Sequence, residues 1–123
     1  MIFGDPGTEA FKFSEGGGFE SLGFLPGDVV SVIRGISRDG LVLGGSSWTG
    51  PQGSRNFSSH AVVWDPHGIR DIAGELSAAG IDFTDIALSD VTNAWSGSPL
   101  VVLGSGSIGK SQIAWVATLP ERP

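Results

Sequence analysis

Three similar segments, spaced at a nearly constant interval, constrain the fold of this chain more than any other feature of its sequence. They are Glu9–Ser14, His60–Asp65 and Ile113–Thr118, and each has alanine in second place with large apolar residues after it. They begin about 51 and 53 residues apart. A period of about 50 residues indicates a chain built from copies of one supersecondary unit, in which each copy buries its apolar face against the next.

The residues between these segments also correspond, so an order of four apolar strands occurs twice and a fifth strand begins at Ile113. The chain has 20 glycines, and many tight turns are typical of all-β proteins. We therefore expect an all-β fold: a partial β-propeller with two four-stranded antiparallel blades, a terminal strand and one short helical insertion. The corresponding pairs are Gly17–Gly23 with His67–Ala73, Val32–Ser37 with Thr84–Ser89, and Gly40–Ser46 with Leu100–Gly106.

The repeat divides the chain into three parts. Residues 1–59 form the first blade-like repeat with a linker loop, residues 60–112 form the second with the helical insertion, and residues 113–123 form a closing strand. Asp39-Gly40 predicts a two-residue hairpin turn between two apolar runs, because glycine accepts the positive φ that such turns require. In the second repeat the longer polar loop Val91–Pro99 takes the place of this turn.

A short helix is expected in the second repeat. The apolar residues of Ile69–Ala79 recur at the spacing of one helix face. Gly80 stands where such a helix would end, because glycine readily adopts the left-handed conformation that closes many helices. Elsewhere we expect strands, and Trp64 and Trp115 fall on strands as core residues.

The stretch Gly104–Ser111 matches the phosphate-binding loop pattern G-x-x-x-x-G-K-[ST]. In such a loop the Lys-Ser pair opens a helix, whose N-terminal amides hold the phosphate. Here Gln112–Thr118 has the pattern of a strand, so we interpret the match as an accident of a glycine-rich hairpin. Lys110 is then a solvated residue at the hairpin tip, and no nucleotide-binding site is expected.

Composition excludes several classes of function. A formal net charge of -6 makes nucleic acid an unexpected partner, because an acidic protein repels phosphate backbones. The absence of cysteine excludes disulfides and thiolate metal sites. No stretch approaches the roughly 18 to 20 apolar residues of a membrane-spanning helix, so no membrane insertion is expected. The first residues have no pattern of a signal peptide, which predicts a cytoplasmic protein if Met1 is the native start.

Aromatic and acidic residues in the expected loops are the candidate ligand-binding residues. Trp48 and Trp95 could stack on a ligand ring, and Asp82, Asp85 and Asp90 cluster near the second inserted loop, where paired carboxylates could act on a sugar. The histidines at positions 60 and 67 have no third ligand nearby in the sequence, so we expect surface histidines, no metal and no cofactor.

The chain resembles the HAF-family extracellular repeats of bacterial exported proteins. The resemblance covers nearly the whole chain and rests chiefly on Ala10–Phe13, Leu22–Gly27, Gly35–Ser46 and Ile113–Pro120. It implies propeller-like repeats and an extracellular or cell-surface location. The family usually carries more repeats and a signal peptide, and the resemblance implies no catalytic residues.

These observations favour a non-catalytic structural or interaction module over an enzyme, since no set of nucleophile, base and orienting group is apparent. One alternative is a module that binds a glycan or another small polar ligand through Trp48, Trp95, Asp85 and Asp90. Another is a hydrolase that uses loop carboxylates. We expect a homo-oligomer or part of a longer repeat chain, with a glycan or a protein as ligand, because two blades cannot close a ring.

Overall fold

The computed structural model describes residues 9–50, 58–83, 85–97 and 99–119. Within these ranges the chain forms nine strands, all paired antiparallel, and one short helix, so the expected all-β class is confirmed. The elements are β1 (Phe11–Ser14), β2 (Gly18–Ser21), β3 (Val30–Ile36), β4 (Leu43–Trp48), β5 (Ser59–Asp65), β6 (Gly68–Asp71), α1 (Ile72–Ala78), β7 (Ile86–Trp95), β8 (Leu100–Ile108) and β9 (Ser111–Leu119).

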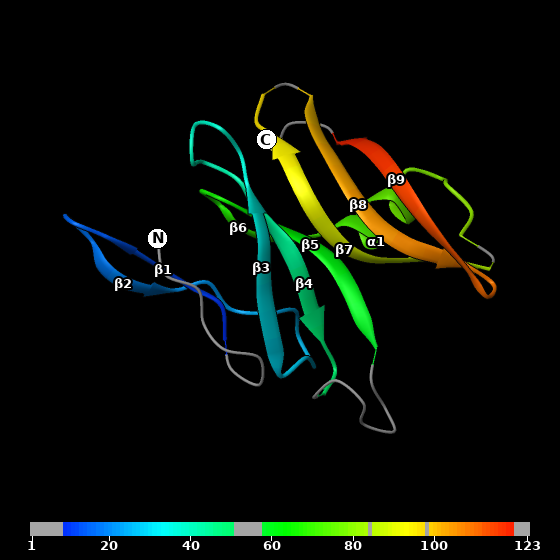
Figure 1. Cartoon of the computed structure of the whole chain (residues 1–123), viewed down its shortest axis with the longest axis horizontal. Helices are drawn as coiled ribbons and strands as arrows, with labels where there is room; N and C mark the ends of the chain where they lie inside the picture. The colour runs from blue at the N-terminus through cyan, green and yellow to red at the C-terminus, as the bar shows by residue number, and fades with distance from the viewer. Residues whose placement is uncertain (1–8, 51–57, 84, 98, 120–123) are drawn as a thin grey trace.

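The strands form a hairpin, β1-β2, a four-stranded sheet, β3-β4-β5-β6, and a three-stranded sheet, β7-β8-β9 (Figure 1). The expected composition of two four-stranded blades is therefore wrong. Strands β4 and β5 pair across residue 59, and β9 begins before residue 113, so each sheet combines the end of one repeat with the start of the next. Pairing breaks instead at the Pro26-Gly27 turn and at α1, where the chain leaves the extended conformation.

The first two repeats nevertheless share one register. When Glu9–Ser14 is placed on His60–Asp65, all four pairs of the β1–β2 hairpin coincide with the four pairs of β5–β6. Phe13 pairs with Phe19 where Trp64 pairs with Ile69. The repeat seen in the sequence is therefore a strand–strand unit in the structure.

The third copy of the segment is displaced by one residue from the expected match. Leu43 and Leu103 correspond, and they pair with Trp64 and Val116 respectively. Val116 is therefore equivalent to Trp64 in the structure, whereas the alignment of the sequence segments made Ala117 its equivalent. A one-residue shift moves every side chain of a strand to the opposite face, so this correction decides which side of β9 is buried.

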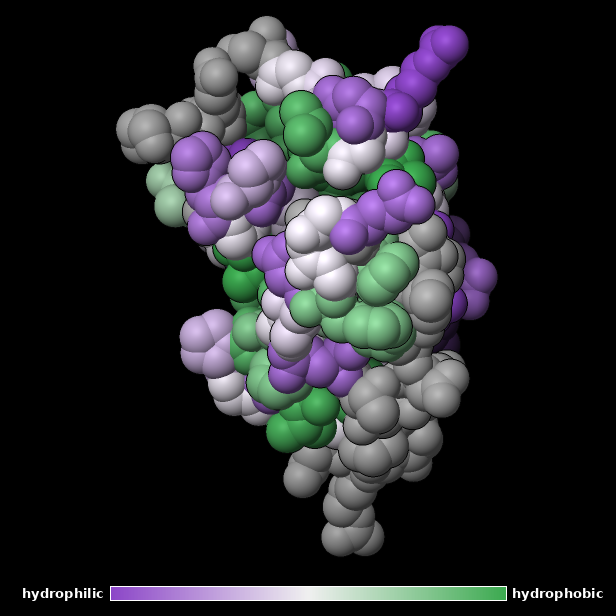
Figure 2. Space-filling model, turned by 90° about the vertical axis from the view of Figure 1, so that its left-hand side faces the viewer, coloured by the Kyte–Doolittle hydropathy of each residue, from purple (hydrophilic) through white to green (hydrophobic). Residues whose placement is uncertain are grey.

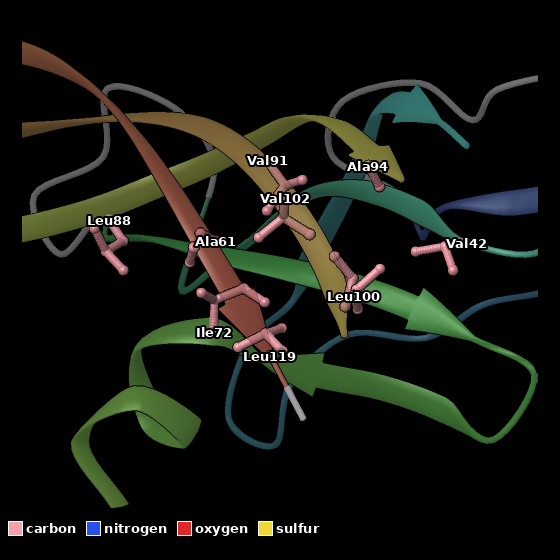
Figure 3. Close-up of a cluster of buried hydrophobic side chains, with 11 residues drawn as sticks. Val42, Ala61, Ile72, Leu88, Val91, Ala94, Leu100, Val102 and Leu119 are labelled. Carbon is pink, nitrogen blue, oxygen red and sulfur yellow. The ribbon is translucent and has the colours of Figure 1, made fainter. Parts of the chain in front are cut away.

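Equivalent faces of the two larger sheets meet in one core. Val42 and Val102 are equivalent, as are Val63 and Trp115, and all four belong to the same apolar cluster. Figure 3 shows side chains of this cluster from both sheets and from α1 converging between them. Propeller blades stack front to back, which would place equivalent residues in different interfaces. The two sheets instead pack as a β-sandwich, and the expected blades are not confirmed.

Glycines allow the two sheets to approach closely. A Cβ atom at Gly35 would collide with the carbonyl oxygen of Thr92, and one at Gly44 would collide with the Val91 side chain. Strand β7 therefore crosses β3 and β4 almost backbone to backbone. Glycine is required here for its missing side chain rather than for an unusual φ.

The other face of the four-stranded sheet is covered by the N-terminal part of the chain. The backbone amide of Ala10 donates to the Ser31 hydroxyl at 2.7 Å, and the Leu22 amide donates to the Ala10 carbonyl at 2.8 Å. These bonds hold a second apolar cluster together, while the β1–β2 hairpin extends away from the body (Figure 1). The members of this cluster are Ala10, Leu22, Leu25, Ile33, Leu43, Val62, Trp64 and Ile69.

Three local expectations need correction. The helix spans Ile72–Ala78 rather than Ile69–Ala79, because its expected first turn pairs with β5 as strand β6, although Gly80 does end it with φ 94°. Strand β7 continues to Trp95, so most of the expected loop Val91–Pro99 is strand. The expected match of Val32–Ser37 with Thr84–Ser89 is also wrong. Strand β7 spans Ile86–Trp95 and contains two bulges, so its pairing with β8 does not follow that alignment.

The hairpin at Asp39-Gly40 exists, with Gly40 at φ 77°. Its loop is longer than two residues, because the Gly40 amide donates to the Ser37 carbonyl and the strands pair only from Ile36 and Leu43 outward. Gly40 thus closes a four-residue turn.

Candidate functional site

Three inter-strand turns from both sheets surround a cleft of about 480 Å³ at one end of the sandwich. They are the β3–β4, β5–β6 and β7–β8 turns, which share this end because the strands before them run in the same sense. Apolar side chains of the core form part of its wall, and polar side chains from the turns form the rest. The lining of this end cleft includes Asp39, Val42, Asp65, His67, Arg70, Ser96 and Leu100.

Asp39 joins the two sheets at the end cleft. Its Oδ1 accepts hydrogen bonds from the Ser37 hydroxyl at 2.7 Å and from the Leu41 amide at 3.1 Å. Its Oδ2 accepts a hydrogen bond from the Ser96 hydroxyl of the β7–β8 turn. The Ser96 hydroxyl, followed by the Ser37 hydroxyl and the Leu41 amide, lowers the pKa of Asp39. Asp39 is therefore a fixed carboxylate acceptor beside the cleft.

Arg70 supplies the buried positive charge of the cleft. Only 4% of its side chain is exposed, and its Nε and Nη2 atoms donate to the two carboxylate oxygens of Glu75 at 2.8 and 2.5 Å. Its Nη1 lies 3.7 Å from Asp65 Oδ2. The hydrogen bond to Glu75 is the main reason that the pKa of Arg70 is raised, so the guanidinium stays charged. The bidentate pair fixes the Arg70 side chain between helix α1 and the cleft.

Trp95 stands beside the end cleft. It is the last residue of β7 rather than a loop residue, and 51% of its surface is exposed, which leaves its ring open to stack on a ligand. With Arg38, Asp39 and Ser96 it lines a shallow hollow of about 240 Å³. Asp39 and Ser96 also line the end cleft, so the indole ring and the polar turns form one continuous surface.

Trp48 does not belong to this surface. It is the last residue of β4 rather than a loop residue, only 5% of it is exposed, and its Nε1 donates to the Ser46 hydroxyl at 3.0 Å. The expectation that it binds a ligand is therefore wrong, because the strand carries it into the protein interior. Trp64, 3% exposed, is a core residue as predicted, and Trp115 packs at the edge of the core with its Nε1 donating to the Ser105 carbonyl at 2.8 Å.

The expected carboxylate cluster is not assembled. Asp85 precedes β7 in an exposed turn with φ 68°, whereas Asp90 lies inside β7. Five residues of extended chain separate them by roughly 15 Å, which is too far for a retaining or inverting pair. Asp82 is exposed in the segment after α1. None of the three lines the end cleft.

Asp90 is instead half-buried between the sheets, where Arg34 Nε lies 3.5 Å from its Oδ2. Burial raises the pKa of Asp90, and the charge of Arg34 offsets this only in part. Its Oδ1 is buried with no partner among the described residues. The ionised carboxylate is thus more costly in the folded state than in the unfolded chain.

We expect Asp90→Asn to raise the melting temperature at pH 7. Because the folded pKa is raised, the wild-type penalty is present at neutral pH and is relieved as pH falls through that pKa. Well below about pH 4 the Asp90 carboxyl group of the wild type is protonated in both the folded and the unfolded state. The difference in melting temperature between variant and wild type should then vanish. Thermal melts of both proteins between pH 3 and 8 test this, and an unchanged or lower melting temperature at pH 7 contradicts it.

The histidines lie apart. His60 is on β5, and its Nδ1 is 3.0 Å from Oδ2 of the buried Asp28, which also accepts a hydrogen bond from the Ser47 hydroxyl at 2.5 Å. His67 is in the β5–β6 turn beside the end cleft, where its amide donates to Asp65 at 2.8 Å. Among the described residues no three His, Asp or Glu side chains are grouped to hold a metal ion.

The segment Gly104–Ser111 is a hairpin, as predicted. Strand β8 runs to Ile108, Gly109 and Lys110 form the turn, and β9 starts at Ser111, which pairs with Ile108. Strand β9, and not a helix, begins at the Lys-Ser pair, so the segment lacks the helix N-terminus on which a phosphate-binding loop depends. Lys110 is exposed.

Sequence reasoning missed most of the cleft. Asp39, Asp65, His67 and Arg70 all lie in or beside hairpin turns, and of the residues on this surface only Trp95 is a ligand-binding candidate from the sequence. A usable signal was present, because Asp39-Gly40 and Asp65–Gly68 both read as turns. Alternate turns of an antiparallel chain lie at the same end of a sheet, which would have grouped these residues.

Comparison with models of protein families, with curated proteins and with solved structures finds no match to this chain. The resemblance to HAF-family repeats therefore stays a prediction. In the part of the chain that the structure describes, no helix has the length and apolar character needed to cross a membrane.

Proposed function

We propose that the chain is a non-catalytic interaction module that binds a small polar ligand of the carbohydrate class in the end cleft. The observation that carries the proposal is the half-exposed Trp95 beside the fixed carboxylate of Asp39, in a hollow continuous with the cleft. An aromatic ring offers a flat apolar surface to the C–H face of a sugar ring. Carboxylate oxygens accept hydrogen bonds from its hydroxyl groups.

The mixed lining supports a small ligand rather than a second protein. Val42 and Leu100 belong to the buried core, while Asp39 and Asp65 bring carboxylates from two turns. Ligand sites of proteins are typically apolar hollows with a few well-placed polar groups. The bonds of Asp39 to Ser37 and Ser96 keep its geometry fixed before a ligand arrives, which lowers the entropy cost of binding.

The charges at the cleft favour binding over hydrolysis. A glycosidase needs one carboxyl with a raised pKa to act as general acid. The pKa of Asp39 is lowered, and Asp65 faces Arg70 at 3.7 Å. Asp39 therefore suits hydrogen-bond acceptance from hydroxyl groups better than proton donation.

We expect Trp95→Ala to weaken glycan binding at least tenfold, because it removes the stacking surface and leaves the polar turns in place. The wild-type protein is first applied to a glycan array, and the best oligosaccharide is then titrated by calorimetry into wild type and variant. Val29→Ala serves as the control, since Val29 is 53% exposed and lies just before β3, far along the strand from the cleft. Absence of any binder on the array, or equal affinity of Trp95→Ala and wild type, would overturn the proposal.

A second candidate function, a scaffold that joins repeated strand–strand units, is favoured by the shared register of β1–β2 and β5–β6. Such a module would act by joining copies or repeats rather than by holding a small ligand. In such a scaffold the sheets of one copy would continue into the next through their strand edges. The mass of the protein in solution tests this function, because copies joined in this way form oligomers.

A further inference from the structure

Strand β9 has an unprotected edge. It pairs with β8 on one side, and no described strand lies on its other side. Natural proteins usually protect such edges with charged residues, prolines or bulges. The nine residues of β9 contain neither a charge nor a proline, and their pairing with β8 shows no irregularity. The edge strand β7 has two bulges by comparison, and β6 contains Arg70 and Asp71.

The repeat indicates what kind of strand fits beside β9. The first segment, β1, has the short strand β2 beside it, and the second, β5, has β6. Both short strands begin with a glycine at positive φ, Gly18 at 68° and Gly68 at 125°. Strand β9 is the third copy of the same segment and has no such neighbour among the described residues.

An apolar groove follows the same edge. It has a volume of about 400 Å³ and lies between β9 and the segment from α1 to β7. None of its lining residues is charged, so it suits an uncharged apolar side chain. Leu76, Ile81 and Phe83 line it together with Ile113 and Trp115, which point to the core side of β9, whereas Val116 borders it from the outward face of the strand.

The β1–β2 hairpin offers a matching surface at the opposite end of the molecule. Phe11, Phe13 and Phe19 share one face, with ring centroids 5.6 Å apart for Phe11–Phe19 and 4.8 Å for Phe13–Phe19. Figure 2 looks onto this side of the molecule and shows hydrophobic groups among the hydrophilic ones on its surface. Phe19 is 67% exposed and Val116 of β9 is 66% exposed, the two highest values among the large apolar residues described.

We propose that β2 of a second copy of this chain adds to the free edge of β9 that borders the apolar groove, with the partner's Phe19 beside Val116. A two-stranded hairpin is marginally stable alone, and this addition would make it part of a five-stranded sheet, β7-β8-β9 followed by the partner's β2 and β1. Main-chain hydrogen bonds and alternate side-chain pockets are the usual basis of strand addition.

The contact is head to tail. In Figure 1 the hairpin and β9 lie at opposite ends of the long axis, so one molecule cannot join its own two surfaces. Each copy keeps one unused edge after pairing, and the assembly continues as a ring or an open chain.

Complementary variants test the contact. Phe19→Lys blocks the hairpin surface and Val116→Lys blocks the β9 surface, and both positions are exposed enough to leave folding intact, which circular dichroism checks. Each variant alone should sediment at the monomer mass of 12.7 kDa, whereas wild type should grow in mass with concentration up to about 500 µM. An equimolar mixture should give a dimer of about 25 kDa and nothing larger, since each variant retains the surface that the other lacks.

Val29→Lys is the control for added charge at an exposed apolar position, and it should associate like wild type. A wild type that stays monomeric would overturn the proposal. Association that persists in Phe19→Lys would also overturn it, because that result indicates pairing of β9 with another β9. A mixture of the two variants that remains monomeric would exclude the head-to-tail contact.

Discussion

Gly35→Val is expected to destabilise the protein by about 3 kcal/mol or more, because a side chain at this position collides with backbone that cannot move aside. The carbonyl group of Thr92 on β7 lies where the new Cβ would stand. Relief would require β7 to move away from β3, which would open the packing between the sheets. Urea unfolding followed by circular dichroism measures the change, with the m-value as a check on two-state behaviour.

Gly16→Val is the matched control. Gly16 lies in the β1–β2 turn, its φ is not positive, and a Cβ there meets nothing within 4 Å. We expect this control to change stability by less than about 0.5 kcal/mol. Equal effects of the two substitutions would show that β7 does not cross β3 as described.

Arg70→Met should cost about 3 kcal/mol, the lower end of the range for removing one partner of a buried ion pair, because the Glu75 side chain is 33% exposed. Methionine fills much of the same volume, so the loss comes mainly from the charges left behind. Glu75 loses two hydrogen bonds at 2.8 and 2.5 Å, and Asp65, whose side chain is 10% exposed, loses its nearby cation. Chemical denaturation at pH 7 gives the magnitude.

Two further variants separate charge from packing. Arg70→Met combined with Glu75→Gln should recover part of the loss, because one uncompensated carboxylate is removed with its partner. Arg38→Met, in the exposed β3–β4 turn, should change stability by less than about 0.5 kcal/mol. A cost below about 1 kcal/mol for Arg70→Met alone would contradict the buried pair.

The all-β class and the hairpin units could be predicted from the sequence because they are local. Alternating apolar residues and glycine turns fix strands, and the repeat of Glu9–Ser14 at His60–Asp65 fixes one hairpin register. The grouping into sheets could not be predicted in this way. A chain of similar strands can be divided between sheets at any turn, and here the breaks fall after β2 and at α1.

The face of the sheet on which a side chain lies was also not predictable from the sequence. Leu103 pairs with Val116, one residue away from the match that the sequence favoured, and this shift decides that Val116 faces outward. The sequence places Trp48 in a loop, but β4 includes it as its last residue and carries its side chain into the protein interior. Trp95 also ends a strand, but 51% of it is exposed beside the β7–β8 turn, so its ligand-binding role stays a prediction.

An amide nitrogen–hydrogen correlation spectrum locates a bound oligosaccharide on the protein and so tests whether the end cleft is a carbohydrate site. The labelled protein is titrated with the best oligosaccharide from the array. We expect the largest shifts at Asp39–Leu41, His67 and Ser96–Gly97, with the Trp95 indole signal moving in parallel. Shifts centred instead on α1 and β9, or no shift at the three turns at saturating ligand, would rule out a carbohydrate site at the end cleft.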